Sequence, residues 1–155
     1  MKTRINVHVG QTIRFIFLSL ILVISASSCG GGGGDDPTEP EKTPQEIAQE
    51  IFEGTWGIDG GGSINLDGTD VSDKYTGFTM NINNGSFTTT NAGELFPASG
   101  TWSWVGETDN QVTTGSGKQI TLSTLSSSRL VFTFTKTSSN AMAGANGNYT
   151  VTLTK

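Results

Sequence analysis

The stretch that decides the fold is "RLVFTFTK", Arg129–Lys136, in which large apolar and small polar side chains alternate. Leu130, Phe132 and Phe134 fall on one side of an extended chain, because successive side chains of a β-strand point to opposite faces. The threonines between them fall on the other side. The pattern predicts an antiparallel strand with one face buried and the other in water.

Similar runs recur along the chain after residue 54. Two turn signals separate early runs: "NNG" at Asn83–Gly85 predicts a tight hairpin, and "DGGG" at Asp59–Gly62 is expected to join the first two runs. "GETDN" at Gly106–Asn110 predicts another turn. Eight runs within about 100 residues predict an all-β fold, a small antiparallel up-and-down β-barrel of about eight strands. The apolar members of the other seven runs are Trp56 and Ile58; Ile64 and Leu66; Phe78, Met80 and Ile82; Phe87; Trp102 and Trp104; Ile120 and Leu122; Tyr149, Val151 and Leu153.

A short helix is predicted before the first strand, in "TPQEIAQEIFEG", Thr43–Gly54. Thr43 suits the N-cap, Pro44 the first helical position, and Glu46 completes a capping box. Gly54 is expected to stop the helix. A helix of about three turns is not stable alone in water, so its apolar face is expected to dock on the strands.

The N-terminus has the composition of a secretory signal peptide, which we predict to cover residues 1–28. Lys2, Arg4 and Arg14 form a positively charged region, and the apolar run Phe15–Ala26 follows. This run is short for a bilayer span, which disfavours the alternative of an uncleaved membrane anchor.

Small residues stand directly before the chain's one cysteine, Cys29. The sequence "ASSC", Ala26–Cys29, resembles the lipobox of bacterial lipoproteins. The resemblance implies cleavage between Ser28 and Cys29 and a lipid on the Cys29 thiol. It departs from the commonest pattern at Ala26, where Leu is usual, but this looser form is frequent in Bacteroidetes. Several acyl chains would give firm attachment to a membrane.

A glycine-rich and acidic segment, residues 29–42, follows the lipidation site and is predicted to be a flexible linker. Acidic residues soon after a lipidated cysteine resemble the export signal of Bacteroidetes surface lipoproteins. The resemblance implies an outer-membrane location, with the domain at the cell surface. A plain solvated spacer is the alternative.

The segment "EIFEGTWGID", Glu50–Asp59, joins the predicted helix to a strand that begins Gly54-Thr55-Trp56. It resembles the start of lipocalin-like, or calycin-type, barrels, and the resemblance extends over residues 43–155. It implies that the helix closes the barrel base and that Trp56 packs beneath the core. It also implies a small apolar or amphipathic ligand. Arg129 is a candidate to pack against Trp56; a solvated arginine at a strand end is the alternative.

The aromatic residues of the later runs are the candidates for a ligand pocket. An eight-stranded barrel is only just wide enough for its own side chains, so a filled core is the alternative. Leu95 and Phe96, in "GELFPASG", are expected to roof the barrel mouth or to form an exposed contact for a partner or glycan. The pocket candidates are Trp102, Trp104, Phe132, Phe134 and Tyr149.

The sequence favours binding over catalysis. The net charge of −5 disfavours a nucleic-acid partner. The one histidine, His8, lies in the predicted signal peptide, so we expect no Ser–His pair, no histidine metal site, no cofactor and no enzyme. A glycosidase with two carboxylates is disfavoured because the acids lie at turns.

Three aspartates in "LDGTDVSDK" are oxygen ligands of the kind that calcium uses. Asp67, Asp70 and Asp73 are spaced by three residues, unlike the alternate spacing of an EF-hand loop. Turn chemistry is therefore expected for Asp67 and a helix cap for Asp70, and no metal site is predicted. Two functions stay open: a lipid-anchored barrel that binds a small ligand inside, or a packed barrel that contacts glycan or an envelope protein through its loops.

Overall fold

The computed structural model describes residues 40–137 and 145–155, and the compact unit within it spans Pro40–Lys155. The predicted signal peptide, Ser28, Cys29 and most of the predicted linker lie outside the described residues, so their assignments stay predictions. In the described part of the chain, no helix is both long and apolar enough to cross a bilayer.

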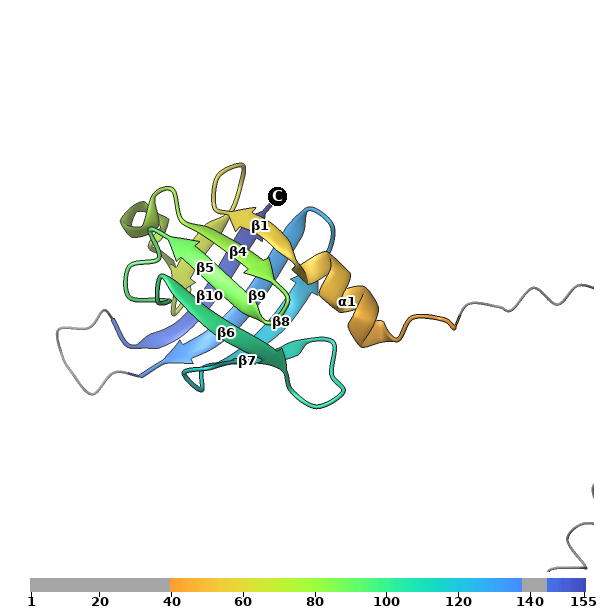
Figure 1. Cartoon of the computed structure of the whole chain (residues 1–155). Helices are drawn as coiled ribbons and strands as arrows, with labels where there is room; N and C mark the ends of the chain where they lie inside the picture. Colours follow the sequence, from red (N-terminus) through yellow and green to blue (C-terminus); the bar gives the residue numbers. More distant parts are fainter. Residues whose placement is uncertain (1–39, 138–144) are drawn as a thin grey trace, which may run out of the picture. The chain divides into compact units, whose positions relative to one another are not determined.

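The described residues form ten strands in one antiparallel sheet, with the helix α1 (Pro44–Phe52) before the first strand and the 3-10 helix η1 (Ser72–Tyr75) in a connection between two strands (Figure 1). Strands β4 to β10 form an uninterrupted up-and-down meander, each paired with the next. The strands are β1 (Gly54–Gly57), β2 (Ser63–Leu66), β3 (Thr69–Asp70), β4 (Thr79–Asn83), β5 (Ser86–Thr90), β6 (Ser99–Trp104), β7 (Gln111–Thr114), β8 (Gln119–Leu125), β9 (Arg129–Lys136) and β10 (Gly147–Thr154).

The sheet closes on itself through β1 and β2. β1 pairs with β4 along its length and meets β10 at Gly57 opposite Thr154. β2 continues along the same edge of β10, with Ile64 opposite Val151. β1 and β2 together therefore fill one position of a closed eight-stranded barrel, which confirms the predicted fold class.

The first two predicted runs are thus one interrupted barrel strand: "DGGG" joins them, as expected, but they do not pair with each other. The segment 58–62 bulges out between them, where Gly60 and Gly61 have positive φ angles of 86° and 110°. A Cβ on Gly62 would lie 2.6 Å from the Cα of Ile58, so this bulge requires a glycine. The barrel still has eight positions because β7 (sequence "QVTT"), which carries one large apolar residue and was not among the predicted runs, supplies the eighth.

The other turn predictions are confirmed. Asn84 and Gly85 both have positive φ, 37° and 73°, and connect β4 to β5 with Asn83 opposite Ser86. This is the geometry that favours Asn-Gly in a two-residue hairpin. The "GETDN" segment lies in the connection between β6 and β7.

The start of α1 is as predicted. The Glu46 amide donates to Oγ1 of Thr43 at 3.2 Å, and the Thr43 amide donates to Oε2 of Glu46 at 2.7 Å, which completes the capping box. The end differs: Glu53 is the extended C-cap, and Gly54, at φ 125°, is the first residue of β1 rather than a left-handed helix stop.

α1 covers one end of the barrel, and η1 lies at the other (Figure 1). The Phe52 ring packs edge-on against the Trp102 ring, with centroids 5.0 Å apart. On the polar side, Nε2 of Gln45 donates to the carbonyls of Gly106 and Thr108 at 3.0 and 2.7 Å. The helix is therefore docked by both an aromatic contact and hydrogen bonds to the β6–β7 connection.

The inward-facing side chains of the barrel strands form one continuous apolar core. Trp56, Ile64, Phe78, Leu130, Val151 and Leu153 are each fully buried, and so is the ring of Phe132 at 2% exposure. Along β9 the buried positions alternate with exposed threonines, as the sequence predicts.

Candidate functional site

The barrel-base motif joins the helix to the last residue of the chain. The Trp56 indole nitrogen donates to the Phe52 carbonyl at 2.8 Å. The ammonium of Lys155 lies 4.1 Å from the centre of the Trp56 ring and donates to the carbonyls of Ile51 and Glu53 at 2.9 and 2.7 Å. A Cβ on Gly54 would lie 3.0 Å from Cε of Lys155, so this glycine leaves room for the lysine.

Lys155 therefore occupies the place that the sequence suggested for an arginine. Arg129 is exposed at the start of β9, opposite Thr154, as the solvated alternative predicted. Burial lowers the pKa of Lys155. Its position at the last turn of α1 is also where a cation stabilises a helix.

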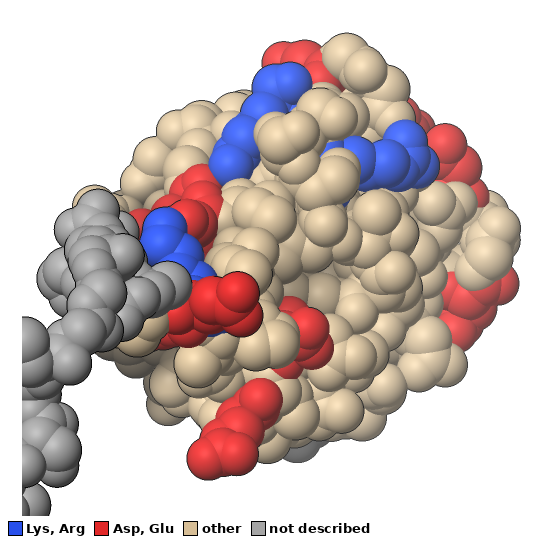
Figure 2. Space-filling model, turned by 90° about the vertical axis from the view of Figure 1, so that its right-hand side faces the viewer, with Lys and Arg blue, Asp and Glu red and all other residues tan. Residues whose placement is uncertain are grey.

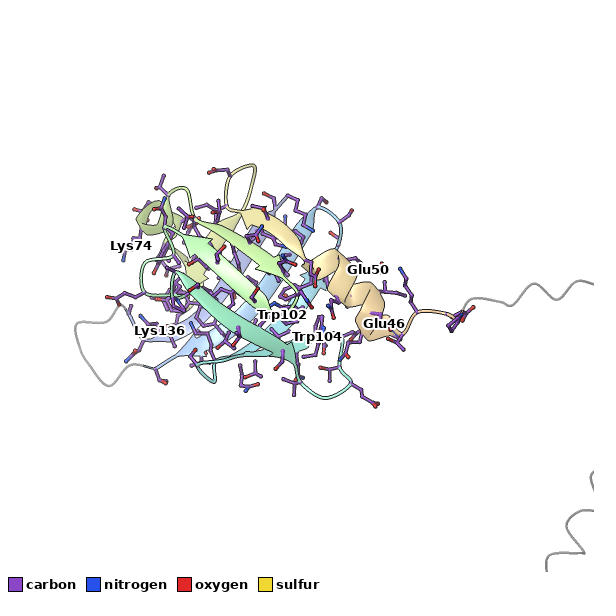
Figure 3. All side chains as sticks on the ribbon, in the orientation of Figure 1. Glu46, Glu50, Lys74, Trp102, Trp104 and Lys136 are labelled. Carbon is purple, nitrogen blue, oxygen red and sulfur yellow. The ribbon has the colours of Figure 1, made fainter. Side chains whose placement is uncertain are left out.

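Two of the five pocket candidates lie at the α1 end of the barrel. Figure 3 shows Trp102 and Trp104 next to α1, where their rings are 5.5 Å apart and Trp104 is 5.7 Å from Phe52. The Trp102 indole donates to the Ser86 carbonyl at 3.2 Å. The indole nitrogen of Trp104 is buried without a hydrogen-bond partner among the described residues.

The other three candidates pack toward the opposite end. Phe134 stacks between Phe132 and Tyr149, with centroid distances of 6.2 and 5.2 Å. The Phe96 ring, from the loop between β5 and β6, packs edge-on against this layer, with centroid distances of 5.3 Å to Phe134 and 6.0 Å to Phe132. These rings fill the barrel interior, so their part in ligand binding stays a prediction, and the filled-core alternative describes their packing.

The loop between β5 and β6 roofs this end of the barrel. Leu95 is 1% exposed and Phe96 is 4% exposed. The roofing prediction is confirmed, and the alternative of an exposed apolar contact at these two residues is wrong. Both side chains are apolar because they belong to the hydrophobic core, which they cover where the strands end.

An open groove of about 910 Å³ lies at this roofed end, and we call it the mouth groove. Its apolar surface comes from the roof and from β9, and its charged groups come from three different segments. Of the five pocket candidates, Phe134 alone lines it. The lining residues include the apolar Leu95, Phe96, Pro97 and Phe134; the polar Ser116, Gln119, Thr121, Thr133, Thr135 and Asn148; and the charged Glu94, Lys118 and Lys136.

Lys118 is the most distinctive group in the mouth groove. Its ammonium lies 4.3 Å from the centre of the Phe96 ring and 4.2 Å from that of Phe134, and it donates to the Leu95 carbonyl. Burial, and then the positive charge of Lys136, lower the pKa of Lys118 to about 8. No sequence motif pointed to this residue, because a lysine after a glycine turn is ordinary and only the fold places it over two rings.

The remaining charges at the mouth come from Lys136 and Glu94, whose side chains form an ion pair at 3.2 Å. Lys136 is only 11% exposed, and Figure 3 places it at the end opposite α1. Tyr75 of η1 also faces this region. Burial, followed by the neighbouring Tyr149 and Glu94, raises the pKa of Tyr75 to about 12. The charged lining of the mouth groove therefore consists of two cations and one carboxylate.

The three aspartates considered for calcium do not come together as a metal site. Oδ1 of Asp67 accepts the Asn148 amide at 3.0 Å, which ties the β2–β3 turn to β10. Oδ1 of Asp70 accepts hydrogen bonds from the Ser72 hydroxyl and, at 2.8 Å, from the Ser72 amide at the start of η1. These two bonds, the hydroxyl first, lower the pKa of Asp70. Within residues 40–137 and 145–155, no group of three or more potential metal-ligating side chains comes together.

A second groove, of about 560 Å³, lies between α1 and β8. Its large apolar lining residues are Ile47, Ile51, Leu122 and Leu125, and Ile47 is 47% exposed. Figure 2 views the side of the molecule that carries α1, where the middle of the face is free of charged side chains.

Comparison with protein-family models found no match, and comparison with curated proteins and with solved structures found no significant match to the chain. The functional argument therefore depends on the barrel, on the mouth groove, and on the residues that line it. These features are sufficient to compare binding inside the barrel with binding at its mouth.

Proposed function

We propose that this chain is a lipid-anchored lipoprotein of the outer membrane, exposed at the cell surface, whose lipocalin-like barrel binds a small amphipathic molecule. The observation that carries the binding proposal is the mouth groove, which combines a partly apolar lining with polar and charged groups. Ligand sites in proteins characteristically have such a lining, with a few convergent polar groups.

The ligand lies at the mouth rather than inside the barrel. The rings of Phe96, Phe132, Phe134 and Tyr149 occupy the interior and contact one another at centroid distances of 5.2 to 6.2 Å. A ligand there would have to displace packed rings from a close-packed core. The mouth groove has a volume of about 910 Å³, which suits a small amphiphile without displacing these packed rings.

The location rests on the N-terminal sequence. A positively charged region, an apolar run and "ASSC" at Ala26–Cys29 support signal cleavage before Cys29 and lipidation of its thiol. The glycine-rich acidic linker then gives the barrel freedom to stand away from the membrane surface. Binding of a small amphiphile at a membrane-attached site fits this location.

A neutral apolar probe tests the binding proposal. Residues 40–155, the compact unit with the complete core, are titrated with N-phenyl-1-naphthylamine and followed by fluorescence. We expect Gln119→Trp, which places a large ring in the mouth groove, to weaken binding at least about tenfold. Gln111→Trp is the matched control, since Gln111 is also exposed on a neighbouring strand but lines neither groove. No binding to the unsubstituted protein, or equal binding to both variants, would contradict the proposal.

Membrane attachment has a separate test. In the full chain, Cys29→Ala removes the thiol that would carry the lipid. We expect the variant to leave the membrane fraction or to keep its signal peptide. Metabolic labelling with an alkyne palmitate should mark the unsubstituted protein alone. Unchanged membrane attachment of the variant would refute the anchor.

The alternative function, a packed barrel that contacts another envelope component, is favoured by one observation. Ile47 is a large apolar residue that is 47% exposed beside the groove between α1 and β8. If N-phenyl-1-naphthylamine binding is lost on Ile47→Gln but not on Gln119→Trp, the α1 side rather than the mouth is the interaction surface.

A further inference from the structure

Lys118 is held at the mouth groove by contacts that do not balance its charge. It donates to one neutral acceptor, the Leu95 carbonyl, and lies 4.2 to 4.3 Å from the centres of two aromatic rings. Across the part of the chain that the structure describes, no carboxylate lies within ion-pair distance of it. A partly buried cation in this setting has lost hydration without gaining a counter-charge.

The charged and titratable groups around Lys118 do not supply the missing charge. Lys136 on β9 is a second cation and lowers the pKa of Lys118. Glu94, in the roof, is paired with Lys136 at 3.2 Å. Tyr75 on η1 has a pKa raised to about 12, and Tyr149 on β10 donates its hydroxyl to the Ala145 carbonyl at 2.9 Å. The two cations and one carboxylate leave this end of the groove with an excess of positive charge.

We propose that the amphipathic ligand of the mouth groove carries a single anionic head, a carboxylate or a phosphate, that pairs with Lys118 while its apolar chain lies along Phe96, Phe134 and Pro97. This inference rests on the proposed function, because it names the ligand class for the same groove. Lys118 exchanges its hydrogen bond to the Leu95 carbonyl for one to the anion.

The exchange is favourable for a physical reason. A hydrogen bond between an ammonium and an anion is roughly twice as strong as one between neutral groups, and it is shielded here by the adjacent rings. A cationic head is disfavoured because it would meet both Lys118 and Lys136. A neutral head would leave the charge of Lys118 without a counter-ion.

The test compares heads on one chain length. Dodecanoate, dodecyl phosphate, dodecanol and dodecyltrimethylammonium, each below its micellar concentration, compete with N-phenyl-1-naphthylamine for residues 40–155 at about pH 7. We expect at least one of the two anions to bind about tenfold or more tightly than dodecanol, and the cation to bind most weakly. The stronger anion identifies the head as a carboxylate or a phosphate.

Lys118→Met keeps the apolar stem and removes the charge, so we expect it to abolish the preference for anions while dodecanol binds as before. Lys74→Met is the matched control, because Lys74 is exposed on η1 and makes the same change in net charge. Equal binding of anion and dodecanol to the unsubstituted protein would overturn this inference alone, as would an anion preference that survives Lys118→Met. No binding of any of the four compounds would overturn the proposed function as well.

The titration of Lys118 gives an independent readout. Saturation with the preferred anion should raise the pKa of Lys118 above about 8, measured from the NMR shift of its Cε methylene. The affinity for the anion should fall between about pH 7 and pH 9.5, whereas that for dodecanol should not. A pKa that is unchanged by the anion would overturn the pairing.

Discussion

The ammonium of Lys155 lies 4.1 Å from the centre of the Trp56 ring and closes the end of α1 at the same time. It donates to the carbonyls of Ile51 and Glu53, groups that a helix end leaves without intrahelical partners. Trp56 completes the arrangement with its bond to the Phe52 carbonyl at 2.8 Å. Lys155, directly after β10, and Trp56 of β1 thus hold the helix on the barrel together.

Removing the Lys155 charge should loosen this arrangement. We expect Lys155→Met to lower the free energy of unfolding by about 1 kcal/mol, the combined size of a cation–aromatic contact and a cation at a helix end. Urea denaturation followed by circular dichroism measures it. Lys74→Met, at an exposed position, should change stability by less than about 0.5 kcal/mol. An equal effect of the two substitutions would show that the contacts of Lys155 contribute nothing.

Gly100 of β6 leaves no room for a side chain beside Phe87. A Cβ there would lie 2.5 Å from Cζ of Phe87, whose ring is 5% exposed and has little room to move. We expect Gly100→Ala to destabilise the fold by about 1–3 kcal/mol through overpacking. Gly57→Ala is the control, since its nearest neighbour would be 3.5 Å away. Thermal unfolding of both variants compares them, and a smaller loss for Gly100→Ala than for Gly57→Ala would contradict the packing argument.

The two tryptophans of β6 differ in one hydrogen bond. Trp102 donates to the Ser86 carbonyl at 3.2 Å, whereas the Trp104 indole nitrogen is buried without a partner in residues 40–137 and 145–155. Both substitutions to Phe remove the same atoms. We expect Trp102→Phe to cost about 1–2 kcal/mol more than Trp104→Phe, because only the former breaks a bond and the latter removes an unsatisfied donor. Equal losses in urea denaturation would contradict this reading.

The alternating pattern predicts the barrel because each strand has one buried face, and it succeeds along β9 and β10, where the apolar residues are large. It fails at β7, because Val112 is the one large apolar residue that this four-residue strand buries. It fails again at β1 and β2, because the glycines of "DGGG" signal a turn but not the partner that each flanking strand takes. The count of eight was correct because these two errors offset each other.

The site was less accessible from sequence. The helix cap and the role of Gly54 and Trp56 as neighbours of α1 follow from local motifs. The partner of Trp56 does not, because Lys155 and Arg129 both carry a positive charge and only the barrel closure brings Lys155 to the helix. Lys118 could not be predicted as a site residue for the same reason: the two rings that it contacts, Phe96 and Phe134, come from segments about 20 residues before and after it.

The free energy of unfolding of the barrel should first rise and then fall as the pH increases above about 8. Burial lowers the folded-state pKa of Lys118 to about 8, so from about pH 8 to 10.5 the unfolded chain holds a proton that the folded protein has lost, and stability rises with pH. Burial also lowers the pKa of Lys155, which adds to the rise. Above about pH 10 the unfolded chain loses the Tyr75 proton that the folded protein keeps to about pH 12, so stability falls.

Urea denaturation at a series of pH values measures this profile for residues 40–155. Lys118→Met should flatten the rise, leaving the part that Lys155 contributes, and Tyr75→Phe should remove the fall at high pH. If the stability of Lys118→Met still rises fully with pH, the ammonium of Lys118 is not desolvated in the folded protein. Its position over the two rings would then have no effect on its titration.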